Sequence, residues 1–284
     1  MLRKKIIIMN KTVTVILIIL LSILTIAVTG MFILLIKGNI NFNWSFNFGG
    51  YSNKLIDSKE IETIKDINID CDIADVFVEE SSDNTIKIEL YSEDSDNYYI
   101  KEEDNTINVK LYPKKKGFQL FGKIEKIIIK IPKDYNKNLK VNFTTGDLKI
   151  ESFPNMRLDF KGSTGDIKAD KLKHISGEIS TGDITIGSVD VFSAATDTGD
   201  IKIDSINKRV YAKTSTGDIK IGEVTVEEDS TIKTSTGDVK IDSLKGAFIE
   251  SHTNTGDIKV NNNDRKLDNT ITINTSTGDI TVNQ

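Results

Sequence analysis

The chain has 284 residues, with 37 Lys and Arg against 42 Asp and Glu and a formal net charge of −5. Five of the basic residues and none of the acidic ones lie in the first 37 positions, so the remainder is distinctly acidic, which argues against a nucleic-acid partner. Cys71 is the only cysteine, so no internal disulfide can form and packing or a metal must stabilise the fold.

The N-terminal region predicts a membrane anchor. Residues 1–12 carry four basic side chains, and residues 13–36 are almost wholly aliphatic. These 24 residues would form a helix of about 36 Å, which is long enough to cross a bilayer. The positive-inside rule then places the N-terminus in the cytoplasm and everything after Lys37 outside the cell membrane. The alternative is a cleaved signal peptide with a site near Ala27 and Thr29, although the apolar run is longer than is usual for one.

The next two segments predict a linker and a cap. Residues 37–59 contain alternating aromatic residues followed by glycines, which is typical of a juxtamembrane linker. Residues 60–142 show the strand alternation without a regular repeat, for example at 72–78 and 126–132. We therefore expect an N-terminal β-cap of degenerate repeats over residues 60–142.

Residues 113–123 form a basic stretch within the acidic part of the chain. A hairpin loop is the simplest interpretation, but lysines interleaved with aromatic residues could also dock on anionic lipid or on wall polymer. The residues that would make this contact are Lys114, Lys115, Lys116, Phe118 and Phe121.

Residues 143–284 are dominated by the tripeptide Thr-Gly-Asp, which recurs eight times. The second and fourth residues after each glycine are apolar, and the residue between them is Lys or Thr, which indicates a half-buried strand. A second strand precedes each glycine, and the buried positions change parity across Gly-Asp. We therefore expect a corner at each glycine, where positive φ carries little steric cost. The corner glycines are Gly146, Gly165, Gly182, Gly199, Gly217, Gly237, Gly256 and Gly278.

One such unit cannot bury its apolar face alone, whereas units stacked at the strand spacing of about 4.8 Å enclose a continuous core. The fold prediction is an all-β ectodomain, a β-solenoid or β-helix of about eight Thr-Gly-Asp coils over residues 143–284, preceded by one transmembrane helix. A sandwich of hairpins is the alternative architecture. Threonines three residues before the later glycines, such as Thr214, are expected to share a hydroxyl with the equivalent residue of the next coil.

The aspartates of the repeat form a column in the predicted stack. Each could accept hydrogen bonds from turn amides, with a nearby lysine reducing the repulsion between neighbours. A calcium column is the alternative, although one carboxylate per coil is few for that ion. Our prediction is a structural role, with no metal and no cofactor. The residues of the column are Asp147, Asp166, Asp183, Asp200, Asp218, Asp238, Asp257 and Asp279.

Three segments together resemble one family. They are Ile67–Val78, with the pattern Ile-x-Ile-x-x-x-x-Ala-Asp-Val-x-Val, the Ile-Pro-Lys-Asp stretch at Ile131–Asp134, and the Thr-Gly-Asp array. The match covers roughly Glu60–Gln284 and is similar to the bacterial β-strand-repeat family labelled "putative adhesin", which includes LiaG-like membrane proteins of cell-envelope stress operons. The resemblance implies a single-span envelope protein with a β-repeat ectodomain and no assigned activity.

No catalytic constellation is visible, since His174 and His252 are far apart and the acidic residues are regularly spaced. We expect a non-enzymatic, membrane-anchored protein that binds, adheres or acts as a stress-associated scaffold in the cell envelope. The alternatives are a calcium-dependent binding module and a partner of a membrane signalling system. Expected partners are the membrane, wall polymer or another envelope protein. The last coil in sequence, Ile271–Val282, is also expected to expose an open edge through which copies associate.

Overall fold

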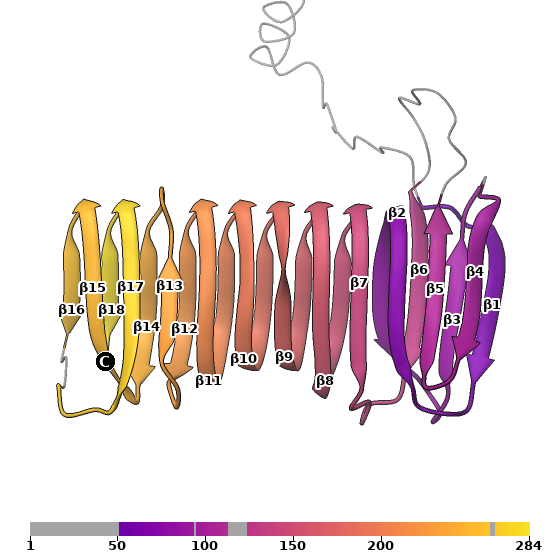
Figure 1. Ribbon diagram of the computed structural model, residues 1–284, viewed down its shortest axis with the longest axis horizontal. Coiled ribbons are helices and arrows are strands. Elements are labelled where there is room, and N and C mark those ends of the chain that lie inside the picture. The colour runs from indigo at the N-terminus through magenta and orange to yellow at the C-terminus, as the bar shows by residue number, and fades with distance from the viewer. Residues whose placement is uncertain (1–50, 94, 113–123, 262–264) are drawn as a thin grey trace, which may run out of the picture. The chain divides into compact units, whose positions relative to one another are not determined.

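The computed structural model describes residues 51–93, 95–112, 124–261 and 265–284 (Figure 1). All regular elements in these ranges are β-strands. The predicted anchor at 13–36 and the basic stretch at 113–123 lie outside the described residues. Within those ranges, no helix has the length and apolar character needed to span a membrane.

Eighteen strands follow one another in the described part of the chain. The first nine are β1 (Leu55–Ile61), β2 (Asp66–Glu80), β3 (Ile86–Tyr91), β4 (Asn97–Glu103), β5 (Thr106–Tyr112), β6 (Glu125–Ile131), β7 (Asn138–Thr145), β8 (Leu148–Thr164) and β9 (Ile167–Thr181). The others are β10 (Ile184–Thr198), β11 (Ile201–Thr216), β12 (Ile219–Thr225), β13 (Ser230–Lys233), β14 (Val239–Lys245), β15 (Ala247–Thr255), β16 (Ile258–Asn261), β17 (Asn269–Thr277) and β18 (Ile280–Asn283).

The repeats form a β-solenoid of about seven turns, bounded by the eight Gly-Asp corners. Strand segments that precede a corner lie side by side in one layer, which we call the front sheet, and segments that follow a corner form the back sheet. Neighbouring coils pair in parallel, as in β8–β9 and β10–β11. This parallel pairing rules out the alternative of stacked hairpins, whose strands would be antiparallel.

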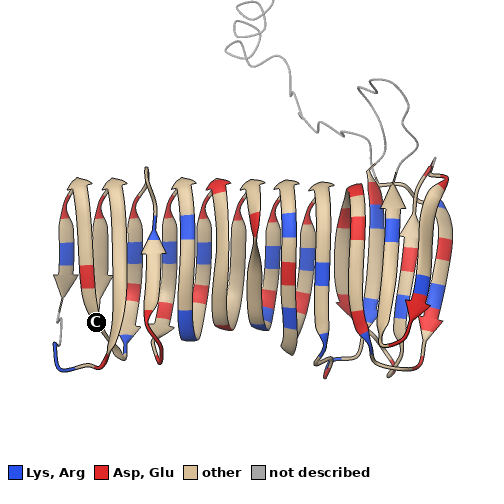
Figure 2. Cartoon of the chain, in the orientation of Figure 1, with Lys and Arg blue, Asp and Glu red and all other residues tan. Residues whose placement is uncertain are grey.

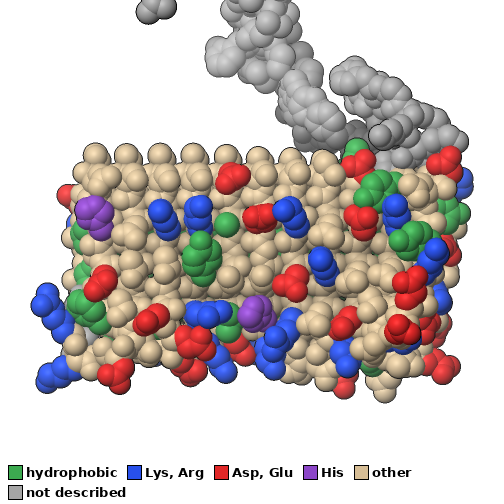
Figure 3. Space-filling model, in the orientation of Figure 1, with side chains coloured by type: hydrophobic (Ala, Val, Ile, Leu, Met, Phe, Trp, Pro, Cys, Tyr) green, Lys and Arg blue, Asp and Glu red, His purple; other side chains and the backbone are tan. Residues whose placement is uncertain are grey.

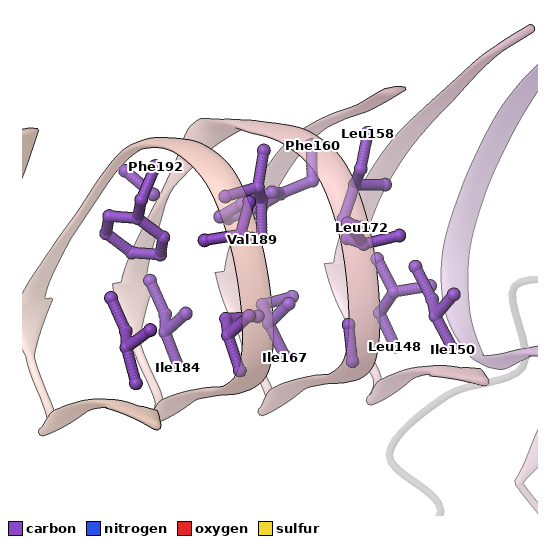
Figure 4. Close-up of a cluster of buried hydrophobic side chains, with 14 of the residues drawn as sticks. Leu148, Ile150, Leu158, Phe160, Ile167, Leu172, Ile184, Val189 and Phe192 are labelled. Carbon is purple, nitrogen blue, oxygen red and sulfur yellow. The ribbon is translucent and has the colours of Figure 1, made fainter. Parts of the chain in front are cut away.

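The core lies between the two sheets. Figure 4 shows side chains of both sheets pointing toward one another, with Ile167 and Ile184 from the back sheet and Leu158 and Phe192 from the front. All four are completely buried. Burying one such side chain contributes about 1.5–3 kcal/mol, so the stacked apolar columns are the main stabilising feature.

Side chains of different size also interlock between coils. A Cβ atom on Gly162 would lie 2.3 Å from the ring of Phe143, and one on Gly177 would lie 2.7 Å from the ring of Phe160. Each phenylalanine therefore fills the space left by a glycine in the next coil. The core keeps its width because a large residue is followed by the smallest one.

The order of the last two coils in the stack differs from their order in sequence. β14 pairs with β18 rather than β16, and β13 pairs with β17 rather than β15. The last strands of the chain thus insert between the Gly237 and Gly256 coils, as Figure 1 also shows. The prediction that Ile271–Val282 has an open edge is wrong, because both of its strands are paired on both sides. Among the described strands, the last coil of the stack is instead Ala247–Asn261.

The stack also begins earlier than residue 143. The first half of β2 pairs with β7 and its second half with β8, so β2 is itself a coil, with Ala74-Asp75 at the corner. Beyond β2, the strands β5 and β6 pair with it in parallel, and β4, β3 and β1 continue the two sheets by antiparallel pairing. β1 begins within the segment expected to be a linker at 37–59, so the end of that segment belongs to a strand.

Candidate functional site

A polar groove of about 680 Å³ crosses the outer surface of the front sheet. It runs from β2 and β5 across β7, β8, β9 and β10 to Lys213 on β11. Figure 3 views this face of the molecule and shows charges of both signs distributed over it. A volume of this size is enough for a small-molecule ligand or for a few units of a polymer.

The middle of the groove holds an ion pair between adjacent coils. Lys161 Nζ lies 2.7 Å from Glu178 Oε1, and the two residues are register partners on β8 and β9. The hydrogen bond to Glu178 raises the pKa of the Lys161 ammonium, and the same bond lowers the pKa of the Glu178 carboxyl. Both groups are exposed and charged at neutral pH, so they offer a donor and an acceptor to a ligand.

One end of the groove is formed by Tyr112 on β5 and Asp70 on β2. The Tyr112 hydroxyl donates a hydrogen bond of 2.9 Å to Asp70 Oδ1. Burial and this bond to the carboxylate raise the pKa of Tyr112 to about 12, so the phenol stays protonated at neutral pH. Lys110 Nζ lies 4.7 Å from the centre of the same ring. The ring is therefore fixed in position by groups on two strands.

Small hydroxyl side chains form a row along the groove. On each strand the hydroxyl residue lies two positions after a larger polar residue such as Lys161 or Glu178. The hydroxyl residues occupy the position two residues before the corner glycines Gly146, Gly165 and Gly182, and so repeat at the coil spacing of about 4.8 Å. The row consists of Thr144, Ser163 and Ser180, all exposed, followed by Asp197. Hydroxyl groups donate and accept hydrogen bonds, so this row can contact a polar ligand along its length.

Two titratable groups, one that lines the groove and one outside it, have pKa values raised by burial. The Cys71 thiol is buried, and burial raises its pKa to about 12, so it is not a nucleophile at neutral pH. Burial also raises the pKa of the Glu125 carboxyl. It lies outside the groove lining, where the Ser92 hydroxyl donates to it at 2.6 Å. The lining therefore offers mainly hydrogen-bond donors and acceptors to a ligand.

The aspartate column forms a continuous hydrogen-bond ladder along the corners, where Figure 2 shows acidic residues recurring from coil to coil. Each carboxylate accepts the backbone N–H of the aspartate in the next coil, at 2.8–3.0 Å, as in Asp218 N–H to Asp200 Oδ1. Asp75 is the first acceptor of this ladder, which sequence reasoning missed because alanine replaces glycine before it.

This ladder bears directly on the calcium alternative. One oxygen of each interior carboxylate is already engaged by an amide, and Oδ2 of Asp147 and of Asp218 faces Lys149 and Lys220, at 3.3 and 3.0 Å. Among the described residues, no cluster of three or more His, Cys, Asp or Glu side chains could hold a metal ion. The geometry favours a structural role for the column.

Threonines inside the corners act differently from our expectation. The Thr214 hydroxyl donates at 3.0 Å to the carbonyl of Gly199, in the preceding coil, and not to another threonine. Equivalent bonds join Thr196 to Gly182 and Thr234 to Gly217. The buried hydroxyl and the corner carbonyl thus satisfy each other across the coil boundary.

The family model described as Toastrack DUF4097 matches residues 64–284. The chain belongs to the Toastrack DUF4097 family. This membership confirms the resemblance inferred from the repeat. No curated protein matches the chain.

Three solved structures share similarity with this Toastrack chain. A proposed cell adhesion protein from Clostridium sporogenes is 14% identical, with a TM-score of 0.32, over 81% of this chain and 100% of its own. A proposed adhesin from Bacteroides fragilis is 18% identical, with a TM-score of 0.44, over 82% and 98%. A proposed lipid binding protein from Parabacteroides distasonis is 18% identical, with a TM-score of 0.40, over 81% and 98%.

Proposed function

We propose that this Toastrack protein is a non-enzymatic binding protein of the cell envelope, anchored by residues 13–36 and displaying its solenoid outside the membrane. The anchor and its orientation are supported by the aliphatic run and the basic residues before it. The strands β1 and β3–β6 would cap the end of the solenoid that is nearer to the anchor in the sequence.

The groove on the front sheet carries the proposal. Its hydroxyl row, the Lys161–Glu178 ion pair and the fixed Tyr112 ring match a ligand that is extended, polar and rich in hydroxyl groups. An envelope glycan has this chemistry, because it can donate and accept hydrogen bonds along its length and place an apolar ring face on an aromatic side chain. We therefore assign wall polymer as the ligand class.

The proposal is tested by retention on different surfaces. The full chain, solubilised in detergent, is incubated separately with isolated cell walls, anionic liposomes and intact host cells. Retention on cell walls, competed by soluble wall glycan, is the expected result. Retention on liposomes alone would favour membrane docking, retention on host cells alone would favour adhesion to a host, and either result would overturn the assignment of wall polymer.

A further inference from the structure

Two lysines, which we call the lysine pair, lie at the β11 end of the groove. Lys213 on β11 lines the groove, and Lys233 on β13 is its register partner in the next coil. Both residues are exposed on the outer face of the front sheet. Like charges directly opposite one another on adjacent strands repel and destabilise the pairing. A negative group bound between them would therefore relieve an unfavourable interaction.

The carboxylates nearby do not supply that negative group. Glu178 lies in the same row along the groove, but it is paired with Lys161 at 2.7 Å, and Ala195 separates it from Lys213. Two coil spacings, about 10 Å, thus lie between Glu178 and Lys213, which is comparable to the Debye length in physiological salt. Asp197 also lines this end, but in the part of the chain that the structure describes no ion pair joins a carboxylate to the lysine pair.

An exposed aromatic ring lies beside the lysine pair. Tyr211 is two residues before Lys213 on β11 and points to the same face, because side chains alternate along a strand. Its register partners, Ser193 and Thr231, are small, and Tyr211 is 45% exposed. A tyrosine ring offers a flat apolar face, on which a sugar ring can lie, and a polar edge. This end can therefore contact a sugar and a charged group attached to it.

The two ends of the groove differ in charge. The end at β2 carries the Asp70 carboxylate, which accepts the bond from Tyr112, whereas the end at β11 carries the lysine pair. The strands β2, β7, β8, β9, β10 and β11 pair in this order, so the ends are five coil spacings, about 24 Å, apart. A ligand with a negative charge on every unit would be repelled by Asp70. The arrangement instead favours a neutral stretch followed by a negative group at β11.

We propose that the lysine pair and Tyr211 form a subsite for a sugar that carries a negative group, either a phosphate or a carboxylate. The inference rests on the proposed function, because it names the chemical class of the wall polymer that the groove binds. The two ammonium groups donate charge-assisted hydrogen bonds to the anion, and the sugar lies on the ring of Tyr211. The neutral part of the polymer continues along the hydroxyl row.

Removal of two lysines from either of two faces tests the subsite. Lys213→Gln with Lys233→Gln removes the lysine pair. The control, Lys168→Gln with Lys202→Gln, removes two exposed lysines from the outer face of the back sheet and changes the net charge equally. For the full chain in detergent, retention on isolated cell walls should fall about tenfold or more in the first variant and stay at the wild-type level in the control. Tyr211→Ala should also bind more weakly, and Tyr211→Phe should retain most of the binding. Circular dichroism and a melting curve verify that each variant is folded.

Titration with small sugars separates this inference from the proposed function. The NMR signals of Lys213 and Tyr211 in the full chain are followed while glucose 1-phosphate, glucuronate or glucose is added. The anionic sugars should shift both signals and glucose should not, and a response to only one of the anionic sugars identifies the phosphate or the carboxylate as the group bound. No shift with either anionic sugar, equal shifts with glucose, or equal wall retention of the two double variants would overturn the inference. Failure of the proposed function is a different result, in which cell walls do not retain the wild type.

Discussion

Replacing Asp218 separates the two possible roles of the carboxylate column. Asp218 Oδ1 accepts the Asp238 N–H at 2.9 Å, and its Oδ2 accepts from Lys220 Nζ at 3.0 Å. Asn retains the first of these bonds but not the charge, whereas Ala removes both. We therefore compare Asp218→Asn with Asp218→Ala.

The expected free energies follow from these contacts. Losing the acceptor in Asp218→Ala leaves a backbone N–H without its partner and should cost about 1–2 kcal/mol. In Asp218→Asn, the lost surface ion pair is worth at most about 1 kcal/mol before solvent screening, and repulsion between carboxylates about 4.8 Å apart, of similar size, is relieved. The Asn variant should therefore remain within about 0.5 kcal/mol of the wild type.

Thermal unfolding with and without calcium provides the assay. For a domain of this size, 1 kcal/mol corresponds to roughly 2–4 °C, so Asp218→Ala should melt about 2–8 °C lower and Asp218→Asn almost unchanged. Chelator should have little effect on any of the three proteins. Equal destabilisation by Asn and Ala, or a calcium-dependent rise in Tm that Asp218→Asn abolishes, would refute the structural role.

Three further outcomes are expected. Gly182→Ala should destabilise the protein by at least about 3 kcal/mol in denaturant unfolding, because φ is +147° and the new Cβ would lie 1.9 Å from the Gly165 carbonyl oxygen. A fully folded variant of wild-type stability would contradict the corner geometry. Thr214→Val, which keeps the shape but leaves the Gly199 carbonyl without its donor, should cost about 1–2 kcal/mol, and Thr214→Ser distinctly less if the hydroxyl is what matters. The pKa of Tyr112 is raised from 10.0 to about 12, so its contribution to stability is present below pH 10 and is lost as pH rises toward 12. Tyr112→Phe should therefore lose less stability at alkaline pH than the wild type. An identical dependence of stability on pH in the two proteins would argue against the bond to Asp70.

The loss of stability at acid pH tests the hydrogen bonds of the carboxylate ladder. The N–H of Asp238, followed by Lys220, lowers the pKa of the Asp218 carboxyl below its ordinary value of 3.8. A group with a lowered pKa stabilises the fold above its unfolded pKa, and this stabilisation is lost as pH falls through the folded value. The wild type should therefore lose more stability than Asp218→Asn below about pH 4, as measured by urea unfolding.

Much of the solenoid could be predicted from the sequence, because its local chemistry repeats. Apolar residues two and four positions after each glycine indicate the back sheet, and the change of parity at Gly-Asp indicates the corner. The coil at β2 escaped detection because Ala74 replaces the glycine. The pattern from Ile67 to Val78 has the same spacing, however, and could have identified Asp75.

Other features depend on tertiary packing and have no sequence signal. The Gly256 and Gly278 coils have the same pattern of apolar residues in the sequence, so either order of stacking satisfies the local preferences, and only the pairing of β18 with β14 distinguishes them. The groove was also not anticipated. Its large outward residues, such as Lys161 and Glu178, follow no repeating chemical type, and they come together through the register of four or more coils.

The most direct test of the account is to fill the groove and measure binding to isolated cell walls. Ser180 and Ser276 occupy the same position relative to a corner and are both exposed, but only Ser180 lines the groove. The Trp variants of the two serines therefore differ in whether the groove is blocked. Ser180→Trp should weaken wall retention about tenfold or more, and Ser276→Trp should bind as the wild type does. Equal retention of both variants would contradict binding through the groove.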